Sequence, residues 1–207
     1  MTLFLDAILL GLAIGVVRGG HISRLSTVRL RLESLLVGLF VLQLTLPRLA
    51  TAINVQQSAA LYLWLLIMLA LVVVALMNHR QAGLQLVAIG IGLNALVIAL
   101  NGAMPVSERA VSAVVGHEYH MTAADSDLLH EPLRKSTIAA PLSDLLPLPG
   151  PDWHRGVVSV GDLLLAAGIA RFVFVVMVGK GCAEEAVAAD AAVNSTDCAG
   201  IRDHNAE

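Results

Sequence analysis

Two aspartates near the end of a long polar segment are the residues best placed to do chemistry. Asp144 lies in Pro141-Leu-Ser-Asp-Leu-Leu-Pro, and Asp162 lies in Val157-Val-Ser-Val-Gly-Asp-Leu-Leu-Leu. Two carboxyl groups in a partly desolvated site tend to share one proton, which leaves one acid and one base able to activate a water against an amide. We therefore take Asp144 and Asp162 as a candidate catalytic or proton-handling pair. The alternative is structural: Asp162 caps a helix or bonds to a neighbouring one, and Asp144 caps a turn.

Two asparagines of the apolar stretch 84–103 form a second polar group. Asn94 and Asn101 are seven residues apart and share one helical face, with Gly90 one turn before Asn94. Hydrogen bonding between helices is the simpler role, since small residues beside Asn allow close backbone approach. Asn101 closes its helix at the face expected for Asp162, where it can instead hold a carboxylate or a substrate carbonyl. The predicted pocket consists of Asn94, Asn101, Asp144, Ser159 and Asp162.

Histidines of the polar segment offer a weaker metal-binding pattern. His117 and His120 flank Glu118 and can share a helical face, with His130 or His154 as a distant third ligand. The spacing is not HExxH and no partner motif follows, so we expect a solvated loop, no metal and no cofactor. The sequence also has no phosphate-binding glycine loop, GxSxG elbow, or quinone or haem ligation pattern.

The composition indicates a chain that lives in lipid. Of its 207 residues, 57% are hydrophobic and only 14% are charged, with a mean hydropathy of +0.78, values outside those of soluble domains. Aromatic residues make up 4% and the formal net charge is -3, which argues against a nucleic-acid partner. The lipid bilayer is the expected partner, and a peptide or a lipid-linked molecule at the outer face is the ligand class that the predicted pocket would admit.

The expected fold class is all-α: a polytopic transmembrane helix bundle with about five spans and one long extracytoplasmic loop. A spanning helix needs ~20 mostly apolar residues. Five stretches approach that length: 2–17, 32–46, 58–77, 84–103 and 157–178. The first two are short, so tilt or local thinning of the bilayer must make up their length.

Basic residues predict the orientation in the cytoplasmic membrane. Lys and Arg accumulate in short cytoplasmic loops, and the first loop holds four arginines whereas the loop 47–57 holds only Arg48. The N-terminus is then outside and the long loop 104–156 outside. The tail 181–207, with Cys182 and Cys198, is cytoplasmic and expected to be disordered or a frayed helix. Asp6, near the outer end of the first span, either joins the polar cluster or reaches the lipid headgroups.

The loop 104–156 has two predicted features of its own. Ser107 is a capping residue followed by an amphipathic pattern, which predicts a short helix. Four prolines between Pro141 and Pro151 predict an extended, stiff approach to the last span.

Three motifs carry a resemblance. Asn101-Gly-Ala-Met-Pro-Val-Ser is followed by Leu145-Leu-Pro-Leu-Pro and then by Val158-Ser-Val-Gly-Asp-Leu-Leu-Leu-Ala-Ala-Gly. With them the chain resembles, almost throughout up to Lys180, a family of uncharacterised bacterial integral membrane proteins catalogued as a domain of unknown function. That resemblance implies a fold and a location and no activity.

A more distant resemblance is to the lipoprotein signal peptidases, membrane aspartyl enzymes that cut prolipoprotein signal peptides. Their catalytic aspartates lie in a Val-x-Asp-Phe stretch before the last helix and in a Phe-Asn-x-Ala-Asp motif at its outer end. Leu142-Ser-Asp-Leu and Val158-Ser-Val-Gly-Asp occupy similar places, so the resemblance implies catalytic roles for Asp144 and Asp162 only. The chain departs from the pattern at Ser159 and Gly161 and lacks the Gly-Asn-x-x-Asp-Arg motif.

Overall fold

The chain is mostly helical, as predicted. The computed structural model describes residues 2–121, 129–151 and 153–179. Its α-helices are α1 (Thr2–Val17), α2 (Glu33–Ala52), α3 (Gln57–Met77), α4 (Leu84–Asn101), α5 (Glu108–Val115) and α6 (Val160–Val178). Two 3-10 helices, η1 (Ile22–Thr27) and η2 (Ala140–Leu142), lie in the connections. The predicted tail 181–207 and both cysteines lie outside the described residues.

Four helices are long and apolar enough to cross a membrane, namely α2, α3, α4 and α6. The protein is therefore a multi-pass membrane protein. Helix α1 has 16 residues, which span about 24 Å against a hydrocarbon thickness of ~30 Å. A fifth crossing by α1 stays a prediction.

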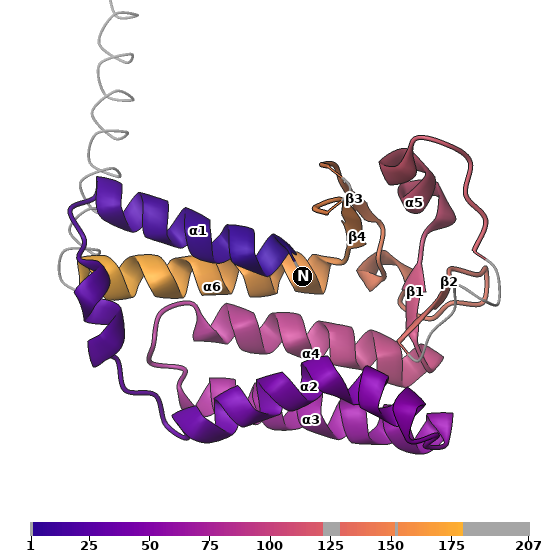
Figure 1. Ribbon diagram of the computed structural model, residues 1–207, viewed down its shortest axis with the longest axis horizontal. Coiled ribbons are helices and arrows are strands. Elements are labelled where there is room, and N and C mark those ends of the chain that lie inside the picture. Colours follow the sequence, from indigo (N-terminus) through magenta and orange to yellow (C-terminus); the bar gives the residue numbers. More distant parts are fainter. Residues whose placement is uncertain (1, 122–128, 152, 180–207) are drawn as a thin grey trace, which may run out of the picture.

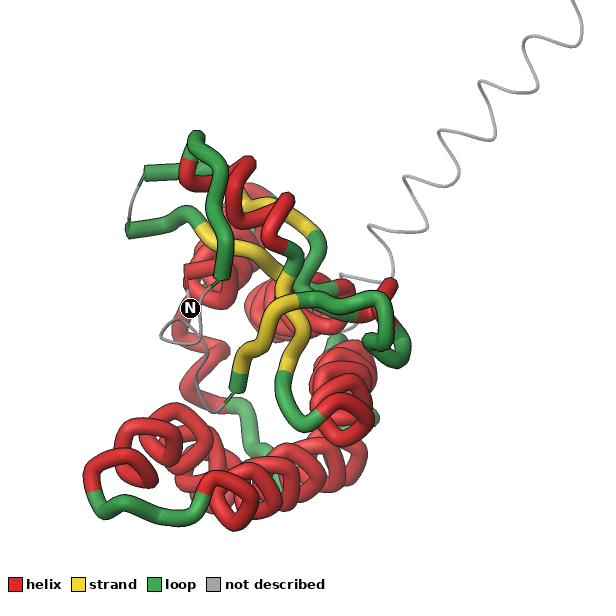
Figure 2. Tube along the Cα trace, turned by 90° about the vertical axis from the view of Figure 1, so that its right-hand side faces the viewer, coloured by secondary structure: helices red, strands yellow, loops and turns green. Residues whose placement is uncertain are grey.

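The long helices form a curved row rather than a closed ring. Helix α1 packs on α6, α6 on α4, α4 on α3 and α3 on α2, so α1 and α2 stand at the two ends of the row (Figures 1 and 2). Helix α1 runs parallel to α6, because Gly11 lies against Ala170 and Gly15 against Met177. Helix α4 runs antiparallel to both.

Glycines hold α4 and α6 in direct backbone contact. A methyl group on Gly90 would lie 2.5 Å from the carbonyl oxygen of Gly161 and 2.7 Å from the backbone nitrogen of Leu165. The same kind of contact recurs two turns away, between Gly83 and Gly168. Small residues at both crossing points are what close helix packing within lipid requires.

Two helices differ from the predicted spans by three residues or more at one end. Helix α2 does not end at residue 46 but continues through Pro47 to Ala52. A proline can lie inside a membrane helix, since lipid offers the backbone no alternative hydrogen-bond partner and the helix is retained around the lost bond. The last helix begins at Val160 rather than 157, because Gly156–Val158 pairs as a strand.

The long polar segment folds over one end of the helices, which we call the strand end (Figure 1). Strand β1 (Met104–Val106) pairs in parallel with β2 (His130–Pro132), and β3 (Leu146–Leu148) pairs antiparallel with β4 (Gly156–Val158). The extended proline-rich approach is confirmed by β3, although Pro141 lies in η2. The predicted amphipathic helix is α5, whose first turn is capped by the Ser107 side chain.

The opposite end, which we call the arginine end, contains the loops after α1 and α3. The Arg24 guanidinium donates to the carbonyl oxygens of Met177 (3.0 Å) and Val178 (2.6 Å) at the end of α6. The Asn78 side chain accepts from the Arg31 N–H at 2.7 Å and donates to the Arg31 carbonyl at 3.0 Å. The Arg24 bonds give partners to the last carbonyls of α6, which the helix itself leaves unpaired. Together the two sets of bonds hold the loop after α1 against the ends of α6 and α3.

Substitution Gly90→Ala is expected to destabilise the bundle by about 1–3 kcal/mol, the usual effect of overpacking, because the new methyl group meets the α6 backbone. Gly92→Ala is the matched control on the same helix, since a methyl group there meets nothing within 4 Å. Thermal unfolding in detergent should show a lower midpoint for Gly90→Ala than for Gly92→Ala. Equal midpoints would contradict the close α4–α6 contact.

Candidate functional site

The β3–β4 hairpin carries Asp144 to the start of α6. In its register Leu146 lies opposite Val158. Asp144 comes two residues before Leu146, and Ser159 follows Val158 directly, so the pairing brings the two chain segments together at the strand end. The hairpin thus supplies the convergence of Asp144 and Asp162 that the sequence suggested.

The backbone of Asp144 is fixed through both its N–H and its carbonyl, which bond to β1 and to the residue after it. Its N–H donates to the Pro105 carbonyl at 3.0 Å, and its carbonyl accepts from the Ser107 N–H at 2.9 Å. Asp144 also forms a parallel bridge with Val106. Residue 144 is therefore paired with β1 through its backbone, and the position of its Cα does not depend on its side chain.

Asp162 is held in a closed network of hydrogen bonds with Asn94 and Ser159. Asp162 Oδ1 accepts from Asn94 Nδ2 at 2.8 Å, and Oδ2 accepts from the Ser159 N–H at 3.1 Å. Ser159 Oγ donates to Asn94 Oδ1 at 2.9 Å and accepts from the Asp162 N–H at 3.0 Å. The last bond completes a capping box at the start of α6. The structural roles considered for Asp162 and Asn94, capping and bonding between helices, are thus both present.

The carboxyl of Asp144 differs, because its environment does not satisfy it. The residue is only 7% exposed, and its Oδ1 has no hydrogen-bond partner within the described residues. Burial, and secondly the negative charge of Asp162, raise the pKa of Asp144 to about 8. Asp144 is therefore mainly neutral at pH 7, while Asp162 receives two N–H bonds suited to a carboxylate, which only accepts.

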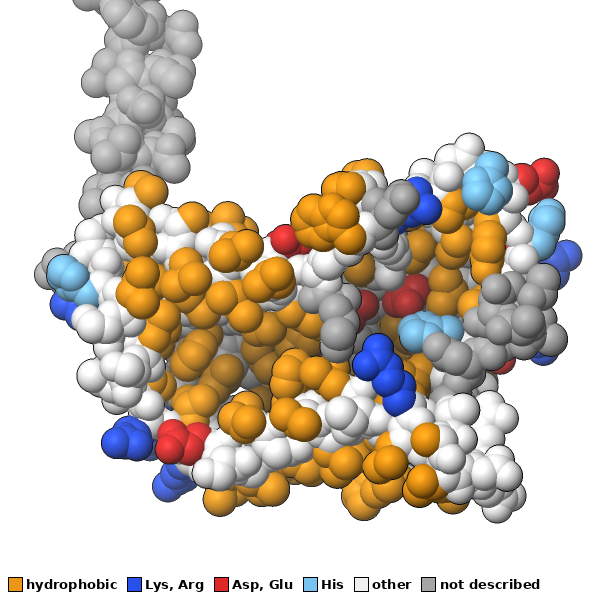
Figure 3. Space-filling view, in the orientation of Figure 1, with side chains coloured by type: hydrophobic (Ala, Val, Ile, Leu, Met, Phe, Trp, Pro, Cys, Tyr) orange, Lys and Arg blue, Asp and Glu red, His pale blue; other side chains and the backbone are white. Residues whose placement is uncertain are grey.

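Both aspartates line one cavity of about 460 Å³ on the concave side of the helix row. Figure 3 shows it as a trough lined by hydrophobic side chains, with acidic and histidine side chains near the strand end. Asn94 also lines it, as do residues of α1, α2, α3 and α6. The arrangement places one neutral acid and one hydrogen-bonded carboxylate at the polar end of an apolar trough.

Two members of the predicted pocket stand apart from this cavity. Ser159 is fully buried and bonds to Asn94 and Asp162 without lining the cavity itself. Asn101 instead binds the backbone of Ile138, donating to its carbonyl and accepting from its N–H, both at 2.9 Å. This pair of bonds fastens the segment before η2 onto the end of α4. Among the described residues Asn101 holds no carboxylate, and its role in holding a substrate carbonyl stays a prediction.

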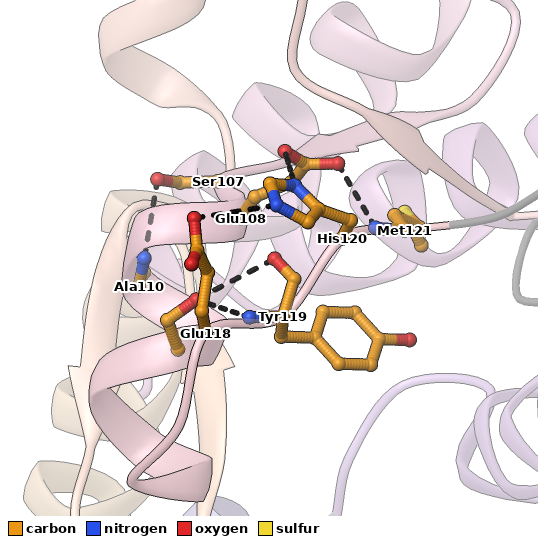
Figure 4. Close-up of polar contacts among 8 residues, drawn as sticks. Ser107, Glu108, Ala110, Glu118, Tyr119, His120 and Met121 are labelled. Carbon is orange, nitrogen blue, oxygen red and sulfur yellow. Dashed lines mark hydrogen bonds and ion pairs between the residues drawn. The ribbon is translucent and has the colours of Figure 1, made fainter.

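The histidines and Asp6 form separate contacts. His120 lies 3.4 Å from Glu108 and 3.3 Å from Glu118 (Figure 4), and its side chain is exposed. Among the described residues no three His, Cys, Asp or Glu side chains come close enough to hold a metal. Asp6 Oδ2 pairs with His154 Nε2 at 2.7 Å, and Asp6 does not line the cavity of Asp144 and Asp162.

Three further polar residues line the cavity: His130, Trp64 and Gln43. Sequence reasoning considered His130 only as a distant metal ligand and missed Trp64 and Gln43. The indole Nε1 of Trp64 is buried without a hydrogen-bond partner in the described parts of the chain. Trp64 and Gln43 each interrupt an apolar span, and that interruption was the available signal. Which face they occupy follows from the curvature of the helix row, which the sequence does not show.

Comparison with known proteins gives a family and no activity. No curated protein and no solved structure matches the chain. A family model described as a family of unknown function matches residues 27–174, a stretch that begins at the end of η1, includes both aspartates and ends within α6. The chain belongs to this family of unknown function, DUF5317.

Proposed function

We propose that this protein is a membrane-embedded hydrolase in which Asp144 and Asp162 act as an acid–base pair on a substrate held in the trough. One observation carries the proposal: two carboxyl groups line the same apolar cavity, that of Asp162 held by hydrogen bonds and that of buried Asp144 with an oxygen that has no partner among the described residues. Environments that separate the protonation states of two neighbouring carboxyls are typical of acid–base sites. The distant resemblance to lipoprotein signal peptidases implies the same two residues.

The competing hypothesis is a non-enzymatic membrane component, such as a transporter subunit or an interaction partner. It predicts polar groups that satisfy one another and no open pocket. Asn94, Ser159 and Asp162 do satisfy one another. Asp144 Oδ1 has no partner in the part of the chain that the structure describes, and Asp144 lines a cavity of about 460 Å³, within the size range of ligand sites. That combination favours chemistry.

The proposed step is addition of water to a substrate carbonyl. The Asp162 carboxylate accepts a proton from water, the water oxygen bonds to the carbonyl carbon, and the Asp144 carboxyl donates its proton to the carbonyl oxygen. In the resulting tetrahedral diol, Asp162 is protonated and Asp144 is ionised. Collapse returns a hydroxyl proton to Asp144 while Asp162 protonates the leaving nitrogen, which restores both residues. Asn94 and Ser159 are positioning residues that orient Asp162.

The proposed orientation follows the arginines. The arginine end lies in the cytoplasm, as short basic loops do, and the strand end with its aspartates lies on the outside of the cell membrane.

Substitutions Asp144→Asn and Asp162→Asn are each expected to lower kcat by about 100-fold or more, since proton transfer contributes factors of roughly 10²–10⁴. The measurement is cleavage of fluorogenic peptides carrying an N-terminal palmitoyl group in detergent micelles. Asp6→Asn is the control, because Asp6 is a carboxylate at the same end that pairs with His154 and does not line the trough. Wild-type rates in either aspartate variant, with normal membrane accumulation, or an inactive wild type would contradict the proposal.

The protonation of Asp144 is directly measurable. Infrared difference spectra between the wild type and Asp144→Asn should show a protonated carboxyl band at pH 6 that disappears as the pH rises through about 8. In an Asp162→Asn background the midpoint should fall, because the neighbouring negative charge is gone. A band that is already absent at pH 6 would show that Asp144 is ionised and cannot serve as the acid.

Single cysteines test the orientation. With Cys182 and Cys198 replaced by serine, Ser136→Cys at the strand end should react in intact cells with a thiol reagent that does not cross membranes. Ser23→Cys at the arginine end should react only after the cells are opened. Both side chains are exposed, so access depends on the side of the membrane. The reverse pattern would place the aspartates on the cytoplasmic side.

A further inference from the structure

We infer that the trough binds the acyl chain of a neutral or zwitterionic lipid, which enters from the bilayer between α1 and α2. The inference rests on the proposed function only in assigning the polar end of the trough to the reacting group. Binding itself depends on the shape, lining and charge of the trough. It names the substrate class: a molecule with an acyl chain and a head that carries no net negative charge.

The trough is long enough for such a chain. Its lining extends along α4 from Leu84 to Ile98, a rise of about 21 Å. One leaflet accounts for about half of the ~30 Å hydrocarbon thickness. The lining is overwhelmingly apolar between these ends, so filling it with hydrocarbon avoids leaving apolar surface against water.

The trough has two apolar edges on helices that lie at opposite ends of the row. Phe4 and Ile8 of α1 form one edge, and Phe40 and Leu44 of α2 form the other. Ile8, Phe40 and Leu44 are exposed large hydrophobic side chains. In a multi-pass membrane protein such exposed apolar side chains face lipid tails, so a chain can move sideways from the bilayer into the trough.

A buried donor within the trough points to a ligand with an acceptor. Trp64 is 7% exposed, and its Nε1 has no partner in the described residues. A buried N–H without an acceptor is costly in apolar surroundings. The ester or amide carbonyl of an acylated ligand provides an acceptor that no described residue supplies.

The charges at the polar end of the trough restrict which lipid headgroup fits there. The described residues that line the trough include Asp144, Asp162 and His130 and no lysine or arginine. A phosphate monoester or another head with net negative charge would meet the Asp162 carboxylate without a guanidinium or ammonium partner. A neutral ester head or a zwitterionic head avoids that repulsion, which supports the neutral or zwitterionic class.

Trp64 itself is the probe for the test. Trp153→Phe removes the exposed second tryptophan and leaves Trp64 as the single emitter. The protein is reconstituted into vesicles that contain phosphatidylcholine with brominated acyl chains, which quench tryptophan on contact. We expect strong quenching of Trp64, and at least twofold less quenching with brominated phosphatidylglycerol at the same fraction. In Asp162→Asn the difference between the two lipids should shrink.

A larger side chain that fills part of the trough can be compared with the same substitution outside it. Ile91 lines the trough, whereas Ile89 on the same helix is 51% exposed and does not. Ile91→Phe should reduce quenching by at least twofold, and Ile89→Phe should leave it unchanged. Absence of quenching, equal quenching in both variants, or stronger quenching by phosphatidylglycerol would overturn the inference. If Ile91→Phe does not fold, the comparison of the two lipids in the unfilled protein decides.

The two proposals fail separately. Quenching with the expected lipid preference, together with wild-type kcat in Asp144→Asn, would remove the hydrolase and leave the lipid site. Loss of activity in the aspartate variants without any quenching of Trp64 would remove the lipid site and leave the acid–base pair.

Discussion

The contact between α4 and α6 is the constraint on which the site depends. Gly90 and Gly161 bring the two backbones together, and only at that separation can Asn94 reach both Asp162 and Ser159. Membrane helices associate without a hydrophobic driving force between them, so close packing and hydrogen bonds must supply the stability. Here the same crossing supplies both and also sets the direction of the Asp162 carboxylate.

The two aspartates differ in role: Asp162 has a structural role, and Asp144 is the residue whose carboxyl is left for chemistry. Asp162 completes a capping box and a bond between helices, which makes its orientation independent of any ligand. The backbone of Asp144 is held beside β1 by two hydrogen bonds, and one of its carboxyl oxygens has no partner among the residues that the structure describes. Leaving a buried polar atom unpaired is costly, and the folded chain tolerates that cost at the trough, where a ligand can remove it.

Hydropathy predicted the helices from the sequence, because lipid forces long apolar stretches into helices. The predicted span stopped before Pro47, but α2 continues through it, because the lipid surroundings outweigh the helix-breaking preference of proline. The meeting of Asp144 and Asp162 was predicted from chain direction alone, and the hairpin register supplied the detail. The bonds of Asn101 to Ile138 were not predicted, because they depend on how the long loop returns. The trough with Trp64 and His130 was not predicted, since it arises from the curvature of the helix row.

The two ends of the helix row are anchored unequally. Helix α1 is fastened to the α6 side at both of its ends, through Asp6 with His154 and through Arg24 with Met177 and Val178. Helix α2 packs mainly on α3, and only Leu46 and Ala50 of α2 are buried. Any widening of the opening between α1 and α2 therefore requires movement of α2, while α1 keeps its position on α6.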